Sequence, residues 1–170
     1  MPAAVPRSSL RAEPPEPAMS IQDRLAELGV TLPDAPAPAA NYVPFVVTGH
    51  HVHVSGQISQ GPEGLITGKL GADLDVEAGA GAARACAISL LAQLRRACDG
   101  DLDRLVRVVK LVGFVNSTPD FTDQPKVING ASDFLVAALG EAGRHARSAV
   151  SAASLPFGVA VEIEAIFEIR

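Results

Sequence analysis

Apolar residues recur along the chain with two different periods. Short alternating runs, such as Val52-His53-Val54-Ser55, put every second apolar side chain on one face and predict β-strands. Longer segments with apolar residues three and four positions apart predict amphipathic helices. We expect strands at 45–47, 52–55, 65–67, 105–115, 147–152 and 159–169, and helices at 73–98 and 120–143 after a short one that begins at Ser20.

The helix expected over residues 73–98 combines a capped start with a glycine-rich first half. Asp73 or Asp75 can cap it, and the period of its apolar stripe places Gln93 on the solvent side. Glycines within residues 78–83 lower helix propensity by about 1 kcal/mol each. We expect them to allow a close approach of the helix backbone to a sheet.

The strand expected over residues 105–115 is apolar on both faces apart from Arg107 and Lys110. Such a strand needs cover on both sides, so we expect helices on one face and another subunit on the other. The element order β-β-β-α-β-α-β-β predicts an α+β sandwich, with a mostly antiparallel sheet and two helices on one face. Residues 20–170 are expected to form one domain, and the proline-rich residues 1–19 a disordered tail.

Composition and charge exclude several functional classes. The net charge of −5 argues against a general affinity for nucleic acid, because there is no basic excess to displace counterions. No run approaches 18 continuous apolar residues, so we expect no membrane span. Cys86 and Cys98 lie about 18 Å apart along one expected helix, beyond disulfide reach. Two unpaired thiols are expected in a reducing cytoplasm.

Arg147 is a lone cation in the small apolar run Ala146-Arg147-Ser148-Ala149-Val150. A guanidinium in a half-buried strand is costly unless it is paired or binds an anion, and its planar fork suits a carboxylate. A structural arginine satisfied by an internal acid or by water explains the pattern equally well. Both interpretations stay open at the level of the sequence.

Two further sets of side chains share a strand face. His51 and His53 could be a metal pair, but no third ligand has convincing spacing, so we expect an exposed or interfacial pair and no metal. Glu162, Glu164 and Glu168 could bind a cation, but for Glu164 and Glu168 we favour the simpler explanation of an exposed strand face.

Several of these residues occur in the order found in one protein family. Tyr42-Val43, Ser55-Gly56-Gln57, Asn129, Ala146-Arg147-Ser148 and the segment 162–166 resemble the Rid family of reactive intermediate deaminases, also called YjgF-like proteins. The resemblance covers roughly residues 40–170. It implies a homotrimer of chorismate-mutase-like subunits, with clefts between subunits that bind small 2-imino or 2-keto acids.

The activity that the resemblance implies is hydrolysis of enamines and imines to keto acids and ammonia, without metal or organic cofactor. Arg147 would bind the substrate carboxylate, and Glu162 would position the attacking water. A non-catalytic trimer that binds metabolites or regulates another protein remains the alternative. The resemblance also implies that backbone groups near Gly56 and Ala149 position water and substrate, and that Tyr42, Ser55 and Asn129 line the cleft, although packing would equally explain Tyr42.

The chain departs from the family pattern in two places. Residues 121–129 are about one helical turn longer than usual, which affects the role expected of Asn129, and His145 stands where a proline commonly precedes the Ala-Arg-Ser triplet. If Pro156 centres a simple hairpin, Arg147 lies opposite Ala165 and about 10 Å along the strand from Glu162. Arg147 and Glu162 could then meet through substrate and water, or across a subunit boundary.

Overall fold

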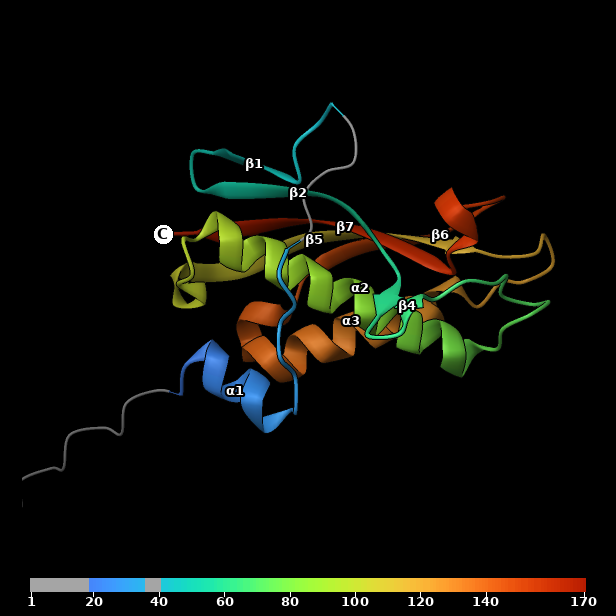
Figure 1. Ribbon diagram of the computed structural model, residues 1–170, viewed down its shortest axis with the longest axis horizontal. Helices are drawn as coiled ribbons and strands as arrows, with labels where there is room; N and C mark the ends of the chain where they lie inside the picture. Colours follow the sequence, from blue (N-terminus) through green and yellow to red (C-terminus); the bar gives the residue numbers. More distant parts are fainter. Residues whose placement is uncertain (1–18, 36–40) are drawn as a thin grey trace, which may run out of the picture.

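Five strands form one sheet in the computed structural model, which describes residues 19–35 and 41–170. The strand order is β1-β2-β7-β5-β6, and helices α2 and α3 lie together on one face of this sheet (Figure 1). A separate two-stranded ribbon is formed by β3 and β4. The elements are α1 (Ile21–Glu27), β1 (Phe45–Thr48), β2 (His51–Ile58), β3 (Gln60–Gly61), β4 (Gly64–Leu65), α2 (Val76–Ala97), β5 (Leu105–Asn116), α3 (Gln124–Leu139), β6 (Ala146–Ala152) and β7 (Val161–Ile169), with 3₁₀ turns at Leu102–Arg104, Gly140–Gly143 and Pro156–Gly158.

This architecture confirms the α+β prediction with a mostly antiparallel sheet and both long helices on one face. The third predicted strand, at residues 65–67, is instead the short β4 outside the main sheet. Helix α3 begins at Gln124 rather than near Asp120, because the chain first turns through Pro119. The predicted tail lies outside the described residues except for Met19.

The predicted hairpin about Pro156 is wrong. Strand β6 pairs in parallel with β5, whereas β7 pairs with the other edge of β5 in antiparallel fashion. Arg147 and Ala165 therefore lie on opposite sides of Leu111 instead of facing each other. The chain crosses from β5 to β6 through α3, and a helical crossover of this kind joins parallel strands.

The core lies between the sheet and the two long helices. Alternate residues of β7, including Ile163 and Phe167, are buried against Leu90 and Leu91 of α2 and Leu135 of α3 within one apolar cluster. Burying a large aliphatic or aromatic side chain contributes about 1.5–3 kcal/mol, so this layer supplies much of the stability. Among the described residues, no helix is long and apolar enough to cross a membrane.

The expectation for Gln93 is wrong, because its side chain is only 1% exposed. Gln93 lies three residues after Leu90 and seven after Cys86, so it belongs to the same buried helical stripe. Cys86 and Cys98 are free thiols, as predicted, and both are buried. Burial raises the pKa of the Cys86 thiol, which donates a hydrogen bond to the Val161 carbonyl.

The close approach expected from the glycines of α2 is made to α3 rather than to the sheet. A side chain at Gly130 of α3 would overlap the backbone of Ala80 on α2. At Gly79 it would press on side chains of Leu70 and Val127, whereas at Gly81 it would meet open space. The small residues thus set the distance between the two helices.

Among the described residues, no α-helix covers the other face of the sheet (Figure 1). Val106 is 43% exposed and Val150 45% exposed, and Lys110 is exposed as well. A hollow of about 250 Å³ on this face is lined by residues including His53, Lys110 and Glu164. The described residues therefore cover strand β5 on one side only.

Candidate functional site

Arg147 lies on the helix side of the sheet, in the edge strand β6. Its register partner Leu111 is buried in the core, so the arginine leaves the strand on that same side. The Nη1 group donates to Ser132 Oγ and the Nη2 group to the Pro125 carbonyl, each over 3.0 Å. Both acceptors are neutral groups of α3.

The charge of Arg147 has no acidic partner within the described residues. The ion pairs there join other groups: Arg104 with Asp99, Lys126 with Asp123, and Arg144 with Glu141. The interpretation of Arg147 as a structural arginine neutralised by an internal acid is therefore not supported. Its remaining N–H groups suit a planar anion.

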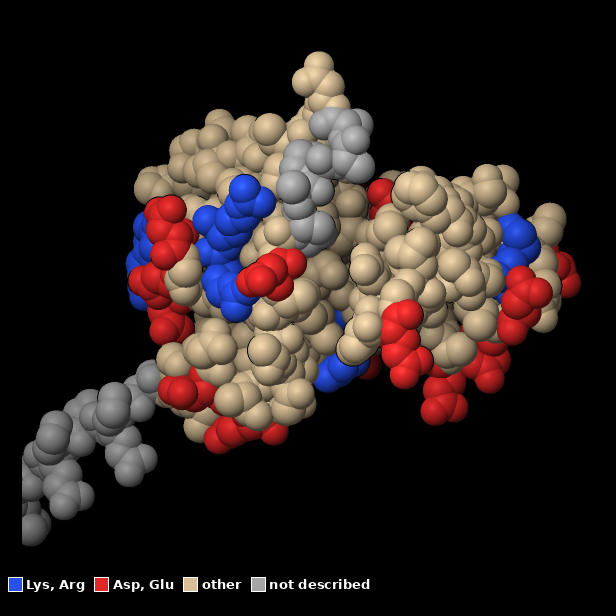
Figure 2. Space-filling model, viewed as in Figure 1, with Lys and Arg blue, Asp and Glu red and all other residues tan. Residues whose placement is uncertain are grey.

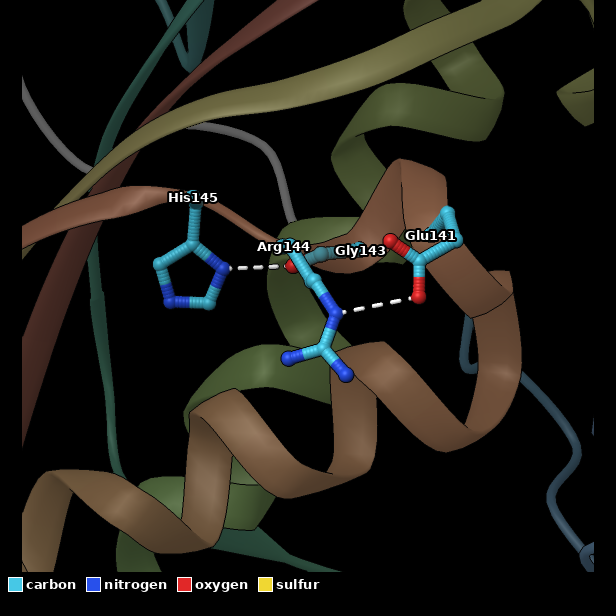
Figure 3. A network of polar contacts seen from close by, with 4 residues as sticks. All are labelled: Glu141, Gly143, Arg144 and His145. Atoms are coloured by element: carbon cyan, nitrogen blue, oxygen red, sulfur yellow. Dashed lines mark hydrogen bonds and ion pairs between the residues drawn. The ribbon is translucent and has the colours of Figure 1, made fainter.

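His145 completes a short chain of hydrogen bonds behind Arg147. Its Nδ1 atom lies 2.6 Å from the Gly143 carbonyl oxygen, and Figure 3 draws this hydrogen bond as a dashed line. Its Nε2 atom lies 3.0 Å from Ser132 Oγ. Burial lowers the pKa of His145, the bond to Gly143 raises it, and the charge of Arg147 lowers it further. The imidazole is thus held neutral beside the guanidinium.

Glu162 lies on the opposite face of the sheet from Arg147. Its neighbours Val161 and Ile163 are buried in the core, and alternation along β7 sends Glu162 to the other side. The Glu162 carboxylate lies over Gly56, where a Cβ atom would overlap it. Partial burial raises the pKa of Glu162, and the nearby charge of Glu164 adds to the effect.

The strand register gives the distance between the Cα atoms of Arg147 and Glu162. Arg147 pairs with Leu111 and Glu162 with Phe114, on opposite edges of β5. Three residues along a strand and two strand spacings separate their Cα atoms by about 14 Å. Because the two side chains also leave opposite faces, a single small molecule cannot contact both within one chain.

The other predicted residues divide between the same two places. Asn129 lies on α3 between Pro125 and Ser132, at the helical spacing that puts the three on one face, and Ala149 lies two residues after Arg147. Ser55 and Gly56 occupy an irregular part of β2, and Gly56 lies against the Glu162 carboxylate. Ser55 Oγ donates to the Val43 carbonyl over 2.8 Å, next to Tyr42, which is 54% exposed.

Sequence reasoning missed the groups that hold Arg147. Ser132 has no distinguishing pattern, although its place three residues after Asn129 could have suggested the same helix face. The Pro125 acceptor is a backbone carbonyl and leaves no signature in the sequence. His51 and His53 are exposed with ring centroids 6.5 Å apart, and the described residues contain no cluster of three or more potential metal ligands.

Comparison with known proteins places this geometry in a family. Residues 22–167 match the family described as "YjgF/chorismate mutase-like, putative endoribonuclease". The chain belongs to this YjgF/Rid family. It is 54% identical over 148 residues to Protein TCP17 of Trypanosoma cruzi, covering 86% of this chain and 92% of that protein.

Solved structures of the family share the fold. The protein Atu1372 of Agrobacterium tumefaciens has 51% identity and a TM-score of 0.83, covering 88% of this chain and 92% of that one. E. coli TdcF has 28% identity and a TM-score of 0.55, covering 81% and 94%. The much closer agreement with Atu1372 and TCP17 sets this chain in a divergent branch of the family.

Proposed function

We propose that this protein hydrolyses small 2-imino and 2-enamino acids to 2-keto acids and ammonia in the cytoplasm. The observation that carries the proposal is Arg147, a fixed guanidinium whose described partners are the neutral Ser132 hydroxyl and Pro125 carbonyl. A cation held in this way keeps its charge for the carboxylate of a ligand. E. coli TdcF, a structural relative, was solved with bound serine, a small molecule with a carboxylate and an amino group.

The proposed assembly is a homotrimer with its sites between subunits. Each chain offers an arginine group, with Arg147, Asn129 and Ala149, and a glutamate group, with Glu162, Gly56 and Ser55, on opposite faces of one sheet. A partner subunit would bring its glutamate group beside the arginine group of the first chain. The sheet face without helices, with Val106 and Val150 exposed, supplies apolar area for this contact.

The proposed chemistry needs water and side chains only. With the substrate carboxylate on Arg147, the carboxylate of Glu162 accepts a proton from water as the water oxygen bonds to the carbon of the iminium, the protonated form of the imine. The nitrogen of the resulting neutral carbinolamine then takes that proton from Glu162. The carbon–nitrogen bond breaks as the C=O bond forms, and the hydroxyl proton leaves with ammonia as ammonium. The raised pKa of Glu162 suits a group that first accepts and then returns a proton.

A second candidate function is a trimeric module that binds metabolites or regulates another protein without turnover. The hydrogen bonds that hold Arg147 favour this binding module equally, because binding a carboxylate requires no catalytic base.

The family's endoribonuclease description fits this chain less well. Its net charge is −5, and Figure 2 shows acidic and basic side chains mixed on the visible face rather than gathered into a basic stripe.

The deciding experiment follows hydrolysis of imines that an amino-acid oxidase generates in situ from several amino acids, with semicarbazide trapping the unhydrolysed imine. We expect wild type to accelerate imine loss, and Arg147→Ala to reduce kcat/KM by roughly 100-fold, as for a lost charged hydrogen-bond pair. The matched control Arg96→Ala removes an exposed cation from α2 and should behave as wild type.

Glu162→Gln separates the two candidate functions. For a deaminase we expect lower turnover with nearly unchanged binding of 2-oxobutyrate, a keto-acid product. Keto-acid binding without acceleration by wild type would select the binding module. Equal loss of binding and turnover in Glu162→Gln would contradict the role of this glutamate.

A further inference from the structure

Arg147, Ser132, His145 and the Gly143 carbonyl are linked in a series of hydrogen bonds. The chemistry of the donors and acceptors determines where each hydrogen lies. His145 Nδ1 faces a carbonyl oxygen, which can only accept, so this nitrogen carries the proton and donates to Gly143. In the neutral ring Nε2 is then an acceptor, and the Ser132 hydroxyl must donate to it. The lone pairs of that hydroxyl are thereby turned toward Arg147 Nη1, which can only donate.

We propose that Ser132 and His145 are positioning residues that fix the guanidinium of Arg147 for a ligand carboxylate. This inference rests on the proposed carboxylate site. It adds the residues that determine the orientation of the Arg147 guanidinium in that site. Ser132 is held from one side by the imidazole and holds the arginine on the other. The Pro125 carbonyl anchors the second nitrogen, so the fork is held at two points.

The reason for a serine and a neutral histidine is electrostatic. A carboxylate in the place of Ser132 would hold the arginine firmly but would compete with the ligand for its charge. A hydroxyl fixes direction without neutralising the cation. Without His145, the Ser132 hydroxyl would be free to rotate, and its acceptor would no longer be directed at Arg147.

Groups on each neighbouring element are consistent with this function. From α3 the ring meets Ser132, from β6 it meets the charge of Arg147, and from the 3₁₀ turn before β6 it meets the Gly143 carbonyl. The charged residues of that turn, Glu141 and Arg144, are joined to each other over 3.1 Å (Figure 3). Glu141 and Arg144 neutralise each other, so Arg147 is the unneutralised charge near His145 among the described residues.

The test uses calorimetric binding of 2-oxobutyrate to the full chain, with imine hydrolysis measured in parallel. Ser132→Ala and His145→Phe should raise Kd and KM by roughly tenfold, the effect of one hydrogen bond to a charged group, with little change in kcat. His145→Gln places an acceptor oxygen where Nε2 lies and should restore binding. His50→Phe, an exposed turn histidine, is the matched control and should leave Kd unchanged.

A second readout reports on the contact directly. In proton NMR, saturating 2-oxobutyrate should move the titration midpoint of the His145 ring to higher pH, because a bound carboxylate offsets the Arg147 charge that lowers this pKa. The signal is assigned by its absence in His145→Gln. An unmoved midpoint under saturating 2-oxobutyrate would show that the ligand carboxylate does not bind at the Arg147 guanidinium, and would overturn the carboxylate site on which the positioning role rests.

The possible failures are distinguishable. If Arg147→Ala loses keto-acid binding while folded Ser132→Ala and His145→Phe keep it, the positioning role is overturned and the carboxylate site stands. If all three lose binding but wild type hydrolyses no imine, the positioning role stands and the deaminase proposal fails. Wild type that binds no keto acid would overturn the positioning role and its carboxylate site together.

Discussion

At the scale of single residues, Glu162 combines a cost in stability with a use in chemistry. Its carboxylate is partly buried over Gly56 and lies near Glu164, and both surroundings disfavour the charged form. The pKa of Glu162 in the fold therefore lies above that of the same side chain in the unfolded chain. Such groups often carry catalysis, because a raised pKa brings a carboxyl group closer to the pH at which it must exchange protons.

We predict opposite effects of Glu162→Gln on stability and on turnover. A raised pKa means that the fold binds this proton more tightly than the unfolded chain, so stability is lost as pH rises through the pKa of the fold. The neutral Gln removes this cost, and its Tm should exceed that of wild type at pH 7.

The Tm difference should vanish below the pKa of an unfolded glutamate. In wild type, kcat/KM should decrease as the pH is lowered and Glu162 becomes protonated. The midpoint of this decrease should lie above the ordinary pKa of a glutamate side chain. Thermal melts and rate profiles over the same buffers check both effects, and a lower Tm for Glu162→Gln at pH 7 would contradict them.

At the scale of elements, the contact between α2 and α3 fixes where the arginine's anchors lie. Gly130 lets α3 approach the backbone of Ala80, and Pro125 and Ser132 lie on the same helix within two turns of Gly130. A change in this crossing would shift the acceptors of Arg147 as a rigid body. The helix packing and the candidate site are thus coupled through α3.

A matched pair of glycine substitutions tests this contact. Gly130→Ala should destabilise the fold by about 1–3 kcal/mol, because its methyl group overlaps backbone atoms that cannot rotate away. Gly81→Ala, where α2 faces open space, should stabilise by about 0.5–1 kcal/mol through helix propensity. Urea unfolding of both variants measures the difference, and equal stabilities would show that α2 and α3 are not held at this distance.

At the scale of the whole molecule, the sheet separates two half-sites. The arginine group lies on the face covered by α3 and the glutamate group on the face without helices. One chain therefore carries both halves of the proposed site without being able to join them. Assembly of subunits is, on this proposal, a requirement for activity rather than an addition to stability.

Mixed oligomers test whether the halves come from different subunits. Arg147→Ala and Glu162→Gln chains, each with low activity alone, should regain about a quarter of wild-type activity when unfolded together in equal amounts and refolded, since one site in four receives both intact residues. Light scattering on the same samples should report a trimer. No recovery in mixed trimers, or an active monomer, would contradict a site shared between subunits.

Local patterns in the sequence determined much of this protein. Ser20 caps α1 where a short helix was expected to begin, Asp75, one of two expected caps, caps α2, and β2 and β7 follow the alternation of their apolar residues. These features depend on neighbours a few residues apart, so the chain itself displays them. Arg147 stood out for the same reason, because a charge in an apolar run is visible locally, whereas the role expected of Glu162 came from the family resemblance.

Only the tertiary structure decided how these pieces meet. It paired β6 with β5 in parallel, which put Arg147 and Glu162 on opposite faces where a hairpin had been expected. It also brought Ser132 and the Pro125 carbonyl to Arg147 across a helical crossover. Strand partners and backbone acceptors are chosen by packing between distant segments, and that choice leaves no mark in the order of the residues.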